Sequence, residues 1–413
     1  MNILIPAASF APSMSGLQRH ALNLTRCLLL TPEISTVHLV FAPWQRNFVH
    51  AAGFRTDGRL ITHVAEMNRS SVGRNLWYYH RLPEMAARLK ADVVHLSYPM
   101  PIKASAFSCP TLVTLHDLYP YEIPMNFGFP KFILNRVVLQ QCLRKVNAIA
   151  CVSDTTLVRL RQYAPTAVCE KAVRIYNCVE LEPVSAVTPP IPGWRSEPFL
   201  LCVAQHRRNK NIPLLIRTFH RMLCAGAVAS DMKLVVIGIT GPETRNIHRL
   251  VKLLNISKRI CFLEGVSESE LQWCYSQCEV VVAPSSTEGF GLPIAEALLA
   301  GCRIVCSDIP AFREIGDRQC RFVALDRNVE KMLGEAIVAT IREAKPMPML
   351  LHRFSAPVLV RQYLNVYRAL IDSATQDQSS QTDQCFGMHE ADAVNICLRR
   401  PALKRSEIDN ERI

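Results

Sequence analysis

Short apolar runs and amphipathic helical patterns alternate along this chain of 413 residues, and the alternation stops once and then restarts. Many repeats of an apolar strand followed by an amphipathic helix are typical of a parallel sheet covered by helices on both faces. The interruption is Val179–Pro198, where one stretch of twelve residues holds four prolines and can form no regular element. The pattern therefore predicts an α/β protein with two doubly wound, Rossmann-like domains that face each other across a cleft.

The expected strands and helices fall into two series. In the first series the strands are Met1–Ala7, Val37–Phe41, Leu60–Val64, Val93–Leu96, Leu112–Leu115 and Ala148–Val152, and the helices include Gly16–Leu30, Asn75–Lys90 and Phe132–Arg144. In the second the strands are Phe199–Ala204, Lys233–Gly238, Ile260–Leu263, Val280–Ala283 and Arg303–Ser307, and the helices are Ile212–Leu223, Thr244–Leu254, Glu268–Cys278 and Pro293–Leu299. We predict a first domain at 1–178, a linker at 179–198, a second domain at 199–355, a helix at 356–371 that packs back across the domains, and a polar, disordered or weakly helical tail at 372–413.

Charge and composition narrow the classes of protein. Lys and Arg exceed Asp and Glu by 47 − 35 = 12, and such a positive field suits phosphate-rich ligands, nucleic acid or an anionic membrane without choosing among them. No 18 apolar residues run together and the first residues have no basic n-region, so we expect a cytoplasmic protein without a transmembrane helix. The sixteen cysteines are scattered and lack zinc spacing, which favours buried, reduced thiols.

The most informative stretch is Pro284–Ala297. Glu288-Gly-Phe-Gly follows an expected strand, and Pro293 stands at the position that proline favours in the first turn of a helix. The amides of this loop would then point at an anion, with the helix dipole behind them. Glu296 lies about one turn into the helix, where it could bind ribose hydroxyls, and Glu288 could bind hydroxyls of a sugar. The alternative is a surface loop with two solvated glutamates, and the glycines, the proline and the strand disfavour it.

Glu288 and Glu296 with their surroundings resemble the E-x7-E motif of the retaining family 4 (group 1) glycosyltransferases, which have the GT-B fold. Further segments resemble the family in its own order, and the resemblance runs from residue 1 to about 371. These segments are Ser15-Gly16 with His20, Val113–Asp117, Val152–Asp154, Ile175–Val179, Leu201–Asn211 and Ser307–Glu314. The chain departs from the family where Ser15-Gly16 replaces two glycines, where Cys178 replaces a glycine, and where Gln205 stands near a common arginine.

The resemblance implies a site and a reaction. The residues that it assigns to catalysis are Glu288, His116 and Lys210. The residues that it assigns to the donor are Gly16, Arg207, Arg208, Lys210, Phe290, Gly291, Leu292 and Glu296. Gln205 stands near the place of a common arginine, so either Arg207 or Arg208 replaces that arginine or the site relies on Lys210 alone. A hexose-type sugar would pass from a nucleotide-diphosphate sugar to a saccharide or lipid-linked saccharide with retention of configuration, in the synthesis of cell-surface polysaccharide or lipopolysaccharide. Positive charge and oriented N–H groups would stabilise the departing diphosphate. We expect neither a metal nor another cofactor, because the chain has no acidic D-x-D cluster.

Two interpretations stay open for His116 and for the helix at Asn75–Lys90. His116 either orients the donor sugar or is a core histidine bonded to backbone. The helix carries Trp77, Tyr78, Tyr79 and His80 beside basic residues, so it either docks on an anionic membrane or places its aromatic side chains in the core. Docking would make the protein peripheral at the inner face of the membrane and would favour a lipid-linked acceptor.

Two rival classes have less support. A non-catalytic or regulatory protein of the same fold, including one that binds nucleic acid, would lack enzymatic motifs, and this chain lacks an RNA-binding or helix-turn-helix signature. Another enzyme of the same fold is the second rival. A sugar-nucleotide epimerase lacks the Glu288-to-Glu296 arrangement, and a glycogen-type phosphorylase needs a pyridoxal lysine in a much longer chain.

Overall fold

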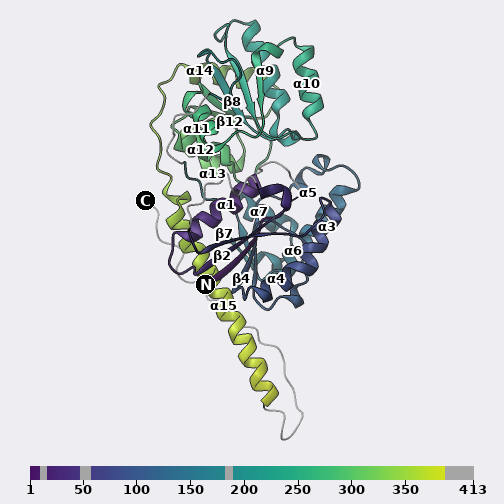
Figure 1. Cartoon of the computed structure of the whole chain (residues 1–413). Helices are drawn as coiled ribbons and strands as arrows, with labels where there is room; N and C mark the ends of the chain where they lie inside the picture. The colour runs from purple at the N-terminus through teal and green to yellow at the C-terminus, as the bar shows by residue number, and fades with distance from the viewer. Residues whose placement is uncertain (10–15, 47–56, 182–188, 387–413) are drawn as a thin grey trace. The chain divides into compact units, whose positions relative to one another are not determined.

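The computed structural model of the chain describes residues 1–9, 16–46, 57–181 and 189–386, the last ten of these by their backbone alone. The residues fall into two compact units, Met1–Ile371 and Asp372–Ile413. Both sheets lie in the first unit (Figure 1).

All strands pair in parallel. The first sheet has the order β3-β2-β1-β4-β5-β6-β7, and its strands are β1 Asn2–Pro6, β2 Thr36–Phe41, β3 Leu60–Val64, β4 Val93–Leu96, β5 Thr111–Leu115, β6 Ala148–Cys151 and β7 Ala172–Arg174. The second has the order β10-β9-β8-β11-β12-β13, and its strands are β8 Phe199–Val203, β9 Lys233–Ile237, β10 Ile260–Leu263, β11 Val280–Ala283, β12 Ile304–Ser307 and β13 Arg321–Val323. Two Rossmann-like sheets are what the alternation predicts.

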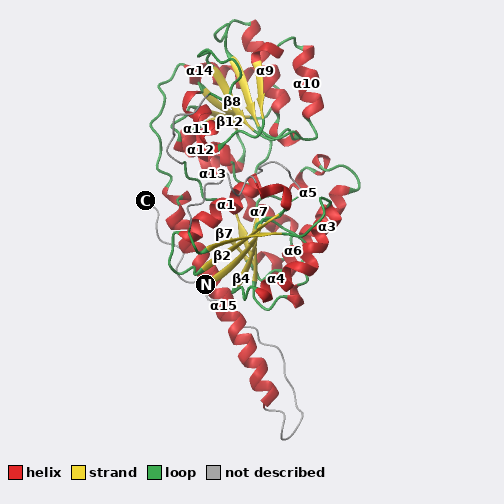
Figure 2. Cartoon of the chain, viewed as in Figure 1, coloured by secondary structure: helices red, strands yellow, loops and turns green. Residues whose placement is uncertain are grey.

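Helices connect the strands and cover the sheets (Figure 2). Those of the first half are α1 Gly16–Leu29, α3 Ser71–Leu76, α4 Leu82–Arg88, α5 Tyr119–Glu122, α6 Lys131–Lys145, α7 Asp154–Tyr163 and α8 Thr166–Cys169. Those of the second half are α9 Ile212–Cys224, α10 Thr244–Leu253, α11 Glu268–Gln277, α12 Leu292–Leu299, α13 Pro310–Gly316, α14 Val329–Ile341 and α15 Ala356–Phe386. Short turns include the π-helical η2 Trp77–Arg81, η4 Pro124–Asn126 and η5 Arg208–Lys210.

The expected elements agree with the observed ones to within a residue or two, with three differences. The helix expected at Asn75–Lys90 begins at Ser71, where the Ser70 hydroxyl accepts a hydrogen bond from the Gly73 amide, and it passes through the π-helical turn η2. Strands β7 and β13 and helices α13 and α14 were not among the expected elements. Helix α15 continues through Ile371 to Phe386 rather than ending at Ile371.

The strand order reverses in both sheets at a crevice-forming position. β1 lies between β2 and β4, and β8 lies between β9 and β11. In each sheet the chain therefore first forms strands on one side of this strand and later returns to form strands on its other side. Ligands of open α/β sheets bind outside the carboxyl ends of strands at such a switch point. The loops after β8 and β11 carry Lys210 and Glu288, the two charged residues on which the predicted site depends.

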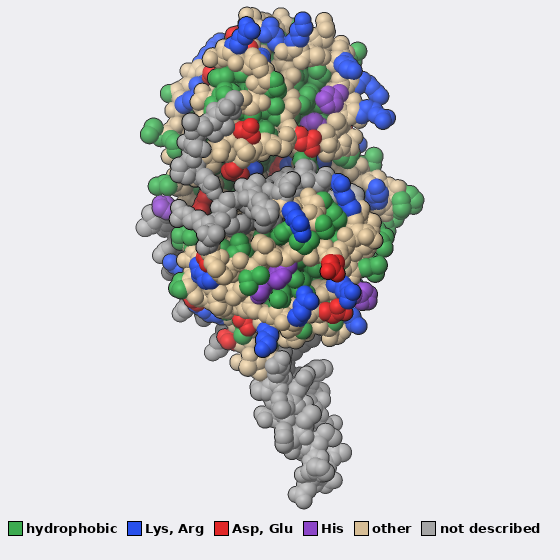
Figure 3. Space-filling model, in the orientation of Figure 1, with side chains coloured by type: hydrophobic (Ala, Val, Ile, Leu, Met, Phe, Trp, Pro, Cys, Tyr) green, Lys and Arg blue, Asp and Glu red, His purple; other side chains and the backbone are tan. Residues whose placement is uncertain are grey.

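One hydrophobic cluster extends through both halves. It contains Ile3 and Ile5 of β1 and Phe199 and Leu201 of β8, and it continues into α15 at Tyr367. Two further clusters fill the opposite faces of the two sheets. Lys and Arg side chains are spread over both halves on the face that Figure 3 shows, rather than gathered in one field. In the described part of the chain, no helix is both long and apolar enough to cross a bilayer.

Candidate active site

The loop after β11 ends in a left-handed residue that starts α12. Gly291 has φ +102° and ψ 50°, and a Cβ there would lie 3.0 Å from the ring of Phe312, so a side chain would be strained in both respects. Ile294 and Ala295 donate their amides to the Gly291 carbonyl. Among the described residues, the amides of Phe290, Gly291 and Leu292 find no acceptor. Three unbonded amides therefore lie at the positive end of a helix dipole.

Glu288 is buried at the end of this loop and is held from two elements. Lys210 Nζ lies 2.5 Å from Glu288 Oε1, and the Tyr119 hydroxyl donates to Oε2 at 3.1 Å. The side chain of Arg159 donates to the Glu288 carbonyl at 3.1 Å. Glu288 is only 7% exposed, so the interpretation as a solvated surface glutamate is wrong.

Glu296 is also buried, at 5% exposed, and has two partners. Tyr275 of α11 donates to Oε2 at 2.7 Å, and Arg19 of α1 lies 3.0 Å from Oε1. Arg19 also pairs with Glu268 at 3.3 Å. Sequence reasoning missed Arg19 and Tyr119. Arg19 stands one residue before His20 in a segment that the resemblance had marked, and Tyr119 follows His116-Asp117.

Lys210 stands in the short turn η5 that follows β8. Asn209, beside it, donates through its side chain to the Thr287 carbonyl at 3.2 Å and accepts from Asn126 at 3.0 Å. The Asn209 carbonyl accepts from the Ser286 amide at 2.8 Å. Asn211 ends the turn in the left-handed region, at φ 49°. These bonds tie the loop after β8 to the loop after β11 and bring Lys210 to Glu288.

The two arginines of this loop differ. Arg207 is half-buried and its charge acts on Asp117, where burial raises the pKa of the carboxyl and Arg207 and Lys210 oppose that rise. Arg208 is exposed, and its backbone amide donates to Asn126 at 3.2 Å. The charges of Arg207 and Lys210 therefore both act on Asp117.

Gly289 presses directly against the first half of the protein. A Cβ at this position would lie 1.7 Å from the His116 carbonyl oxygen, which is far inside contact distance. The Gly289 carbonyl accepts hydrogen bonds from the hydroxyls of Ser153 and of Thr156, the latter at 3.0 Å. Only glycine allows this approach, and it places the loop after β11 against the carboxyl ends of β5 and β6.

His116 has features of both interpretations. Its Nε2 lies 2.9 Å from the Ser97 carbonyl, as expected of a core histidine, and its ring packs edge-on against His20 at 4.7 Å. Its backbone nevertheless meets the Glu288 loop through Gly289. Enclosure lowers the pKa of His116 to about 4, so the imidazole is neutral at pH 7 and can donate or accept a hydrogen bond but carries no charge.

A buried polar network lies behind His116. The Thr114 hydroxyl bonds His20 Nε2 at 3.2 Å and His95 Nε2 at 2.8 Å, and His95 Nδ1 bonds the Tyr367 hydroxyl at 2.7 Å. Burial lowers the pKa of His95 to about 3 and also depresses that of His20. The network connects α1, β4, β5 and α15.

The structure also places Gly16 and the segment Asn75–Lys90. Gly16 is exposed at the start of α1, and Ser15 before it lies outside the described residues. In the segment Asn75–Lys90 two of the four residues named above lie in the core, because Trp77 is 6% exposed and Tyr78 is fully buried, with its hydroxyl bonded to the Ala8 carbonyl at 3.0 Å. Tyr79 is half-buried and His80 is exposed, so membrane docking by this segment stays a prediction. Within the described ranges, no group of three or more His, Cys, Asp or Glu is placed to hold a metal ion.

Two doubly wound parallel sheets with charged loops at their strand ends, in contact through Gly289 and His116, define the GT-B class of fold. Residues 14–183 match the sequence profile described as Glycosyltransferase Family 4, and residues 190–346 match the profile described as Glycosyl transferases group 1. The two matches are consecutive, and they contain every strand of the two sheets except β1. The chain belongs to the group 1 glycosyltransferases.

Named relatives are similar over part or most of the chain. The O-antigen chain mannosyltransferase RfbU of Salmonella typhimurium is 27% identical over 205 residues, which are 49% of this chain and 53% of that protein. The chain thus aligns with about half the length of this relative. The O-antigen chain mannosyltransferase B of Escherichia coli is 22% identical over 76% of this chain and 84% of its own. The structure of Anabaena Alr3699/HepE in complex with UDP-glucose superposes with a TM-score of 0.61 at 14% identity, over 90% of this chain and all of that one, and shows the same fold.

Proposed function

We propose that the protein is a retaining glycosyltransferase that moves a hexose-type sugar from a nucleotide-diphosphate sugar to a saccharide or lipid-linked saccharide. The observation that carries this proposal is the group of unbonded amides at Phe290, Gly291 and Leu292 with Lys210 close by, at the switch point of the second sheet. Backbone N–H groups at a helix start together with a lysine are suited to a diphosphate.

The chemistry of glycosyl transfer requires such a group. As the bond to the sugar breaks, negative charge grows on the nucleotide diphosphate, and oriented N–H groups and a cation stabilise it without having to reorganise. In the proposal Lys210, Arg207 and the three amides perform this role. Glu296 in α12 would bind ribose hydroxyls and Glu288 would bind the sugar, each by exchanging a present partner, Arg19 or Lys210, for the donor.

His116 would orient the donor sugar rather than act as an obligatory base. A neutral imidazole next to the Glu288 loop can hydrogen-bond a sugar hydroxyl. Retention would follow from attack on the front face of the sugar, with the leaving phosphate accepting the acceptor's proton. The first half of the chain would then hold the acceptor.

The names of the relatives support the biological setting. Two relatives are named as O-antigen chain mannosyltransferases, and a superposed structure holds UDP-glucose. We infer a role in the synthesis of cell-surface polysaccharide or lipopolysaccharide, in the cytoplasm, with no metal or other cofactor.

A thermal-shift screen against GDP-, UDP-, dTDP- and ADP-sugars tests the proposal, because a ligand that binds only the folded state raises the melting temperature. One donor class should raise it in the wild type and much less in Glu296→Ala. The exposed residue Glu335, substituted as Glu335→Ala, serves as the control and should keep the full shift. No shift with any donor would favour a non-catalytic protein of this fold.

The rate of transfer tests the residues that contact the leaving group and the sugar. Once the donor is identified, Lys210→Ala should lower kcat/KM. The loss should correspond to about 2–3 kcal/mol of transition-state stabilisation. Glu288→Ala should mainly lower kcat. Lys252→Ala, which changes an exposed lysine of α10, should leave both constants unchanged. A wild-type rate in Lys210→Ala would indicate that Arg207, and not Lys210, stabilises the departing diphosphate.

A further inference from the structure

A chain of buried hydrogen bonds runs from α15 to the residue that packs against His116. The Tyr367 hydroxyl bonds His95 Nδ1 at 2.7 Å. His95 Nε2 bonds the Thr114 hydroxyl at 2.8 Å, and the same hydroxyl bonds His20 Nε2 at 3.2 Å. His20 is 4% exposed and the other three side chains are fully buried. Because they are shielded from solvent, these groups have to satisfy one another, which determines where each proton lies.

The Tyr367 hydroxyl sets the direction of this chain. Among the described residues its hydrogen-bond partner is His95 alone, and so its O–H donates to His95 Nδ1. The pKa of His95 is about 3 because the ring is buried, so the imidazole is neutral near pH 7 and carries a single proton. With Nδ1 accepting, that proton is on Nε2. His95 therefore donates to the Thr114 oxygen.

Thr114 extends the same direction to His20. Its hydroxyl has one proton, and because its oxygen accepts from His95, that proton is donated to His20 Nε2. Burial lowers the pKa of His20 well below its ordinary value, so this ring is also neutral and its own proton is on Nδ1. Asn177 supports this tautomer from the far end. A hydrogen bond between His20 and the Asn177 side chain opposes the fall in the pKa of His20, and Asn177 Oδ1 is buried without another hydrogen-bond partner among the described residues.

His20 in turn determines the surroundings of His116. The two rings meet edge to face, with their centroids 4.7 Å apart and their planes at 82°. His116 Nε2 lies 2.9 Å from the Ser97 carbonyl, which can only accept, so Nε2 carries the single proton of this neutral ring. Nδ1 of His116 is then an acceptor, suited to the hydroxyl of a sugar. The orientation of this acceptor depends on the ring of His20 beside it.

We propose that Tyr367 is a positioning residue for the reaction: its hydroxyl starts a one-way chain of hydrogen bonds that holds His20, and through it His116, in one orientation. The chain crosses α15, β4, β5 and α1, so it transmits the position of the last helix of the first compact unit to the candidate active site. The effect on transfer rests on the proposed function, whereas the tautomers of the three histidines do not.

Proton–nitrogen correlation spectra of the full chain, labelled with nitrogen-15 in histidine, test the direction of the chain. Near pH 7, His20 should have its proton on Nδ1, and His95 and His116 should have theirs on Nε2. The variants His20→Gln, His95→Gln and His116→Gln assign the signals. The opposite tautomer at His20 or at His95 overturns the proposal.

The substitution Tyr367→Phe tests the positioning role, because it removes the hydroxyl and keeps the ring. It should lower kcat about tenfold and leave KM for the donor within about twofold, since a misoriented His116 slows the chemical step without removing the contacts that bind the donor. The nitrogen signals of His20 and His116 should shift together with those of His95. A wild-type kcat, or a spectral change confined to His95, overturns the proposal.

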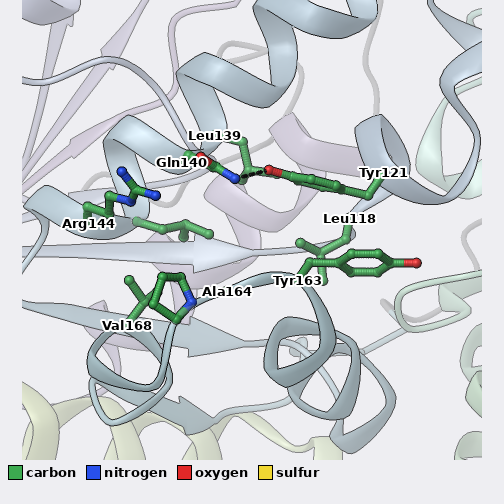
Figure 4. A pocket seen from close by; sticks show the side chains of 10 residues that line it. Leu118, Tyr121, Leu139, Gln140, Arg144, Tyr163, Ala164 and Val168 are labelled. Atoms are coloured by element: carbon green, nitrogen blue, oxygen red, sulfur yellow. Dashed lines mark hydrogen bonds between the residues drawn. The ribbon is translucent and has the colours of Figure 1, made fainter.

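Two other tyrosines provide matched controls. Tyr363 lies one turn before Tyr367 and its ring packs on His95 at 5.2 Å, but its hydroxyl makes none of the bonds of the chain. The Tyr121 hydroxyl accepts a hydrogen bond from Gln140 at 2.5 Å in a small hollow of the first half, away from the chain (Figure 4). Tyr363→Phe and Tyr121→Phe should keep the wild-type kcat. An equal fall in either variant would show that the effect of Tyr367→Phe is not specific to the chain, and would overturn the proposal.

Thr114 allows the chain to be cut in its middle, which keeps the proposal testable if Tyr367→Phe fails to fold. Thr114→Val removes the hydroxyl at nearly constant volume and should lower kcat as Tyr367→Phe does, whereas Thr114→Ser keeps the hydroxyl and should retain most of the rate. Tyr367→Phe/Thr114→Val should be no slower than Thr114→Val alone, because both substitutions break one chain. Effects that multiply in full would mean that the two residues act separately, against the proposal.

These measurements separate the positioning role from the proposed function. An active transferase whose kcat is unchanged in Tyr367→Phe would keep the proposed function and overturn the positioning role. A protein that shows the expected tautomers but transfers sugar from no donor would refute the transferase, and with it any role of Tyr367 in transfer, while supporting the direction of the chain.

Discussion

Gly289 is the residue on which the contact between the two halves depends most directly. In Gly289→Ala the new methyl group would overlap the His116 carbonyl oxygen, a backbone atom that cannot turn aside. The loop must then shift, and we expect a loss of about 1–3 kcal/mol of unfolding free energy together with a large fall in transfer rate. The control Gly58→Ala meets no atom within 4 Å and should leave both unchanged. A fully active Gly289→Ala would show that the loop does not need this contact.

His95 predicts a pH dependence of stability. The pKa of His95 is about 3 in the folded chain against an ordinary value of 6.5. Between these two pH values His95 therefore binds a proton in the unfolded chain but not in the folded chain. The stability that this neutral histidine supports is complete above about pH 6.5 and declines as the pH falls toward 3, by up to about 1.4 kcal/mol per pH unit. Urea unfolding near neutral pH and near pH 5 should show a smaller decline for His95→Gln than for the wild type. Parallel declines would contradict this assignment.

Reasoning from the sequence could not predict which side chains from distant parts of the chain would contact each other in the site. Glu288 and Glu296 were recognisable because glycines, a proline and a strand surround them locally. Arg19 meets Glu296 across 277 positions, and Tyr119 meets Glu288 across 169. No local pattern encodes such pairs. They depend on how the two halves close, which also decides that the aromatic residues at 77 and 78 lie in the core.

At the scale of elements, the carboxylate of Glu314 in α13 caps helix α7 from the other half. It accepts the amides of Asp154 and Thr155 at 2.7 and 2.9 Å and the Thr155 hydroxyl at 2.8 Å. A carboxylate at a helix N-terminus satisfies unbonded amides and opposes the helix dipole.

Glu314→Ala should therefore lower the unfolding free energy by about 1–3 kcal/mol in urea titrations. The matched substitution Glu335→Ala removes an exposed carboxylate of α14 that lies 3.9 Å from Lys331, and it should cost no more than about 0.5 kcal/mol. Equal effects of the two substitutions would mean that the cap contributes nothing.

The regular elements were predictable because each is specified by its own residues. Runs such as Val280–Ala283 are apolar throughout, as a strand buried on both faces requires, and the observed β11 has these bounds. Strand β7 was missed because its three residues, Ala172–Arg174, are partly exposed at the sheet edge and carry too little pattern. The end of α15 was misplaced because a polar sequence does not by itself stop a helix.

At the scale of the whole molecule, the first compact unit ends only at Ile371. A chain truncated after Ile371 should keep the melting temperature of the wild type. A chain truncated after Phe354 would lose Leu359, Tyr363 and Tyr367 from the core and should fail to give a cooperative unfolding transition. Circular dichroism melts of the two truncations test this difference, and similar melts would show that α15 is dispensable for the core.

The bond between His95 and Tyr367 has a consequence for biosynthesis. β4 is the central strand of the first sheet, and the Tyr367 hydroxyl that bonds its buried His95 comes 272 positions later in the chain. Before α15 has been translated, part of the apolar surface of the first half stays uncovered. We therefore expect the nascent chain to offer this apolar surface to chaperones until α15 has been translated.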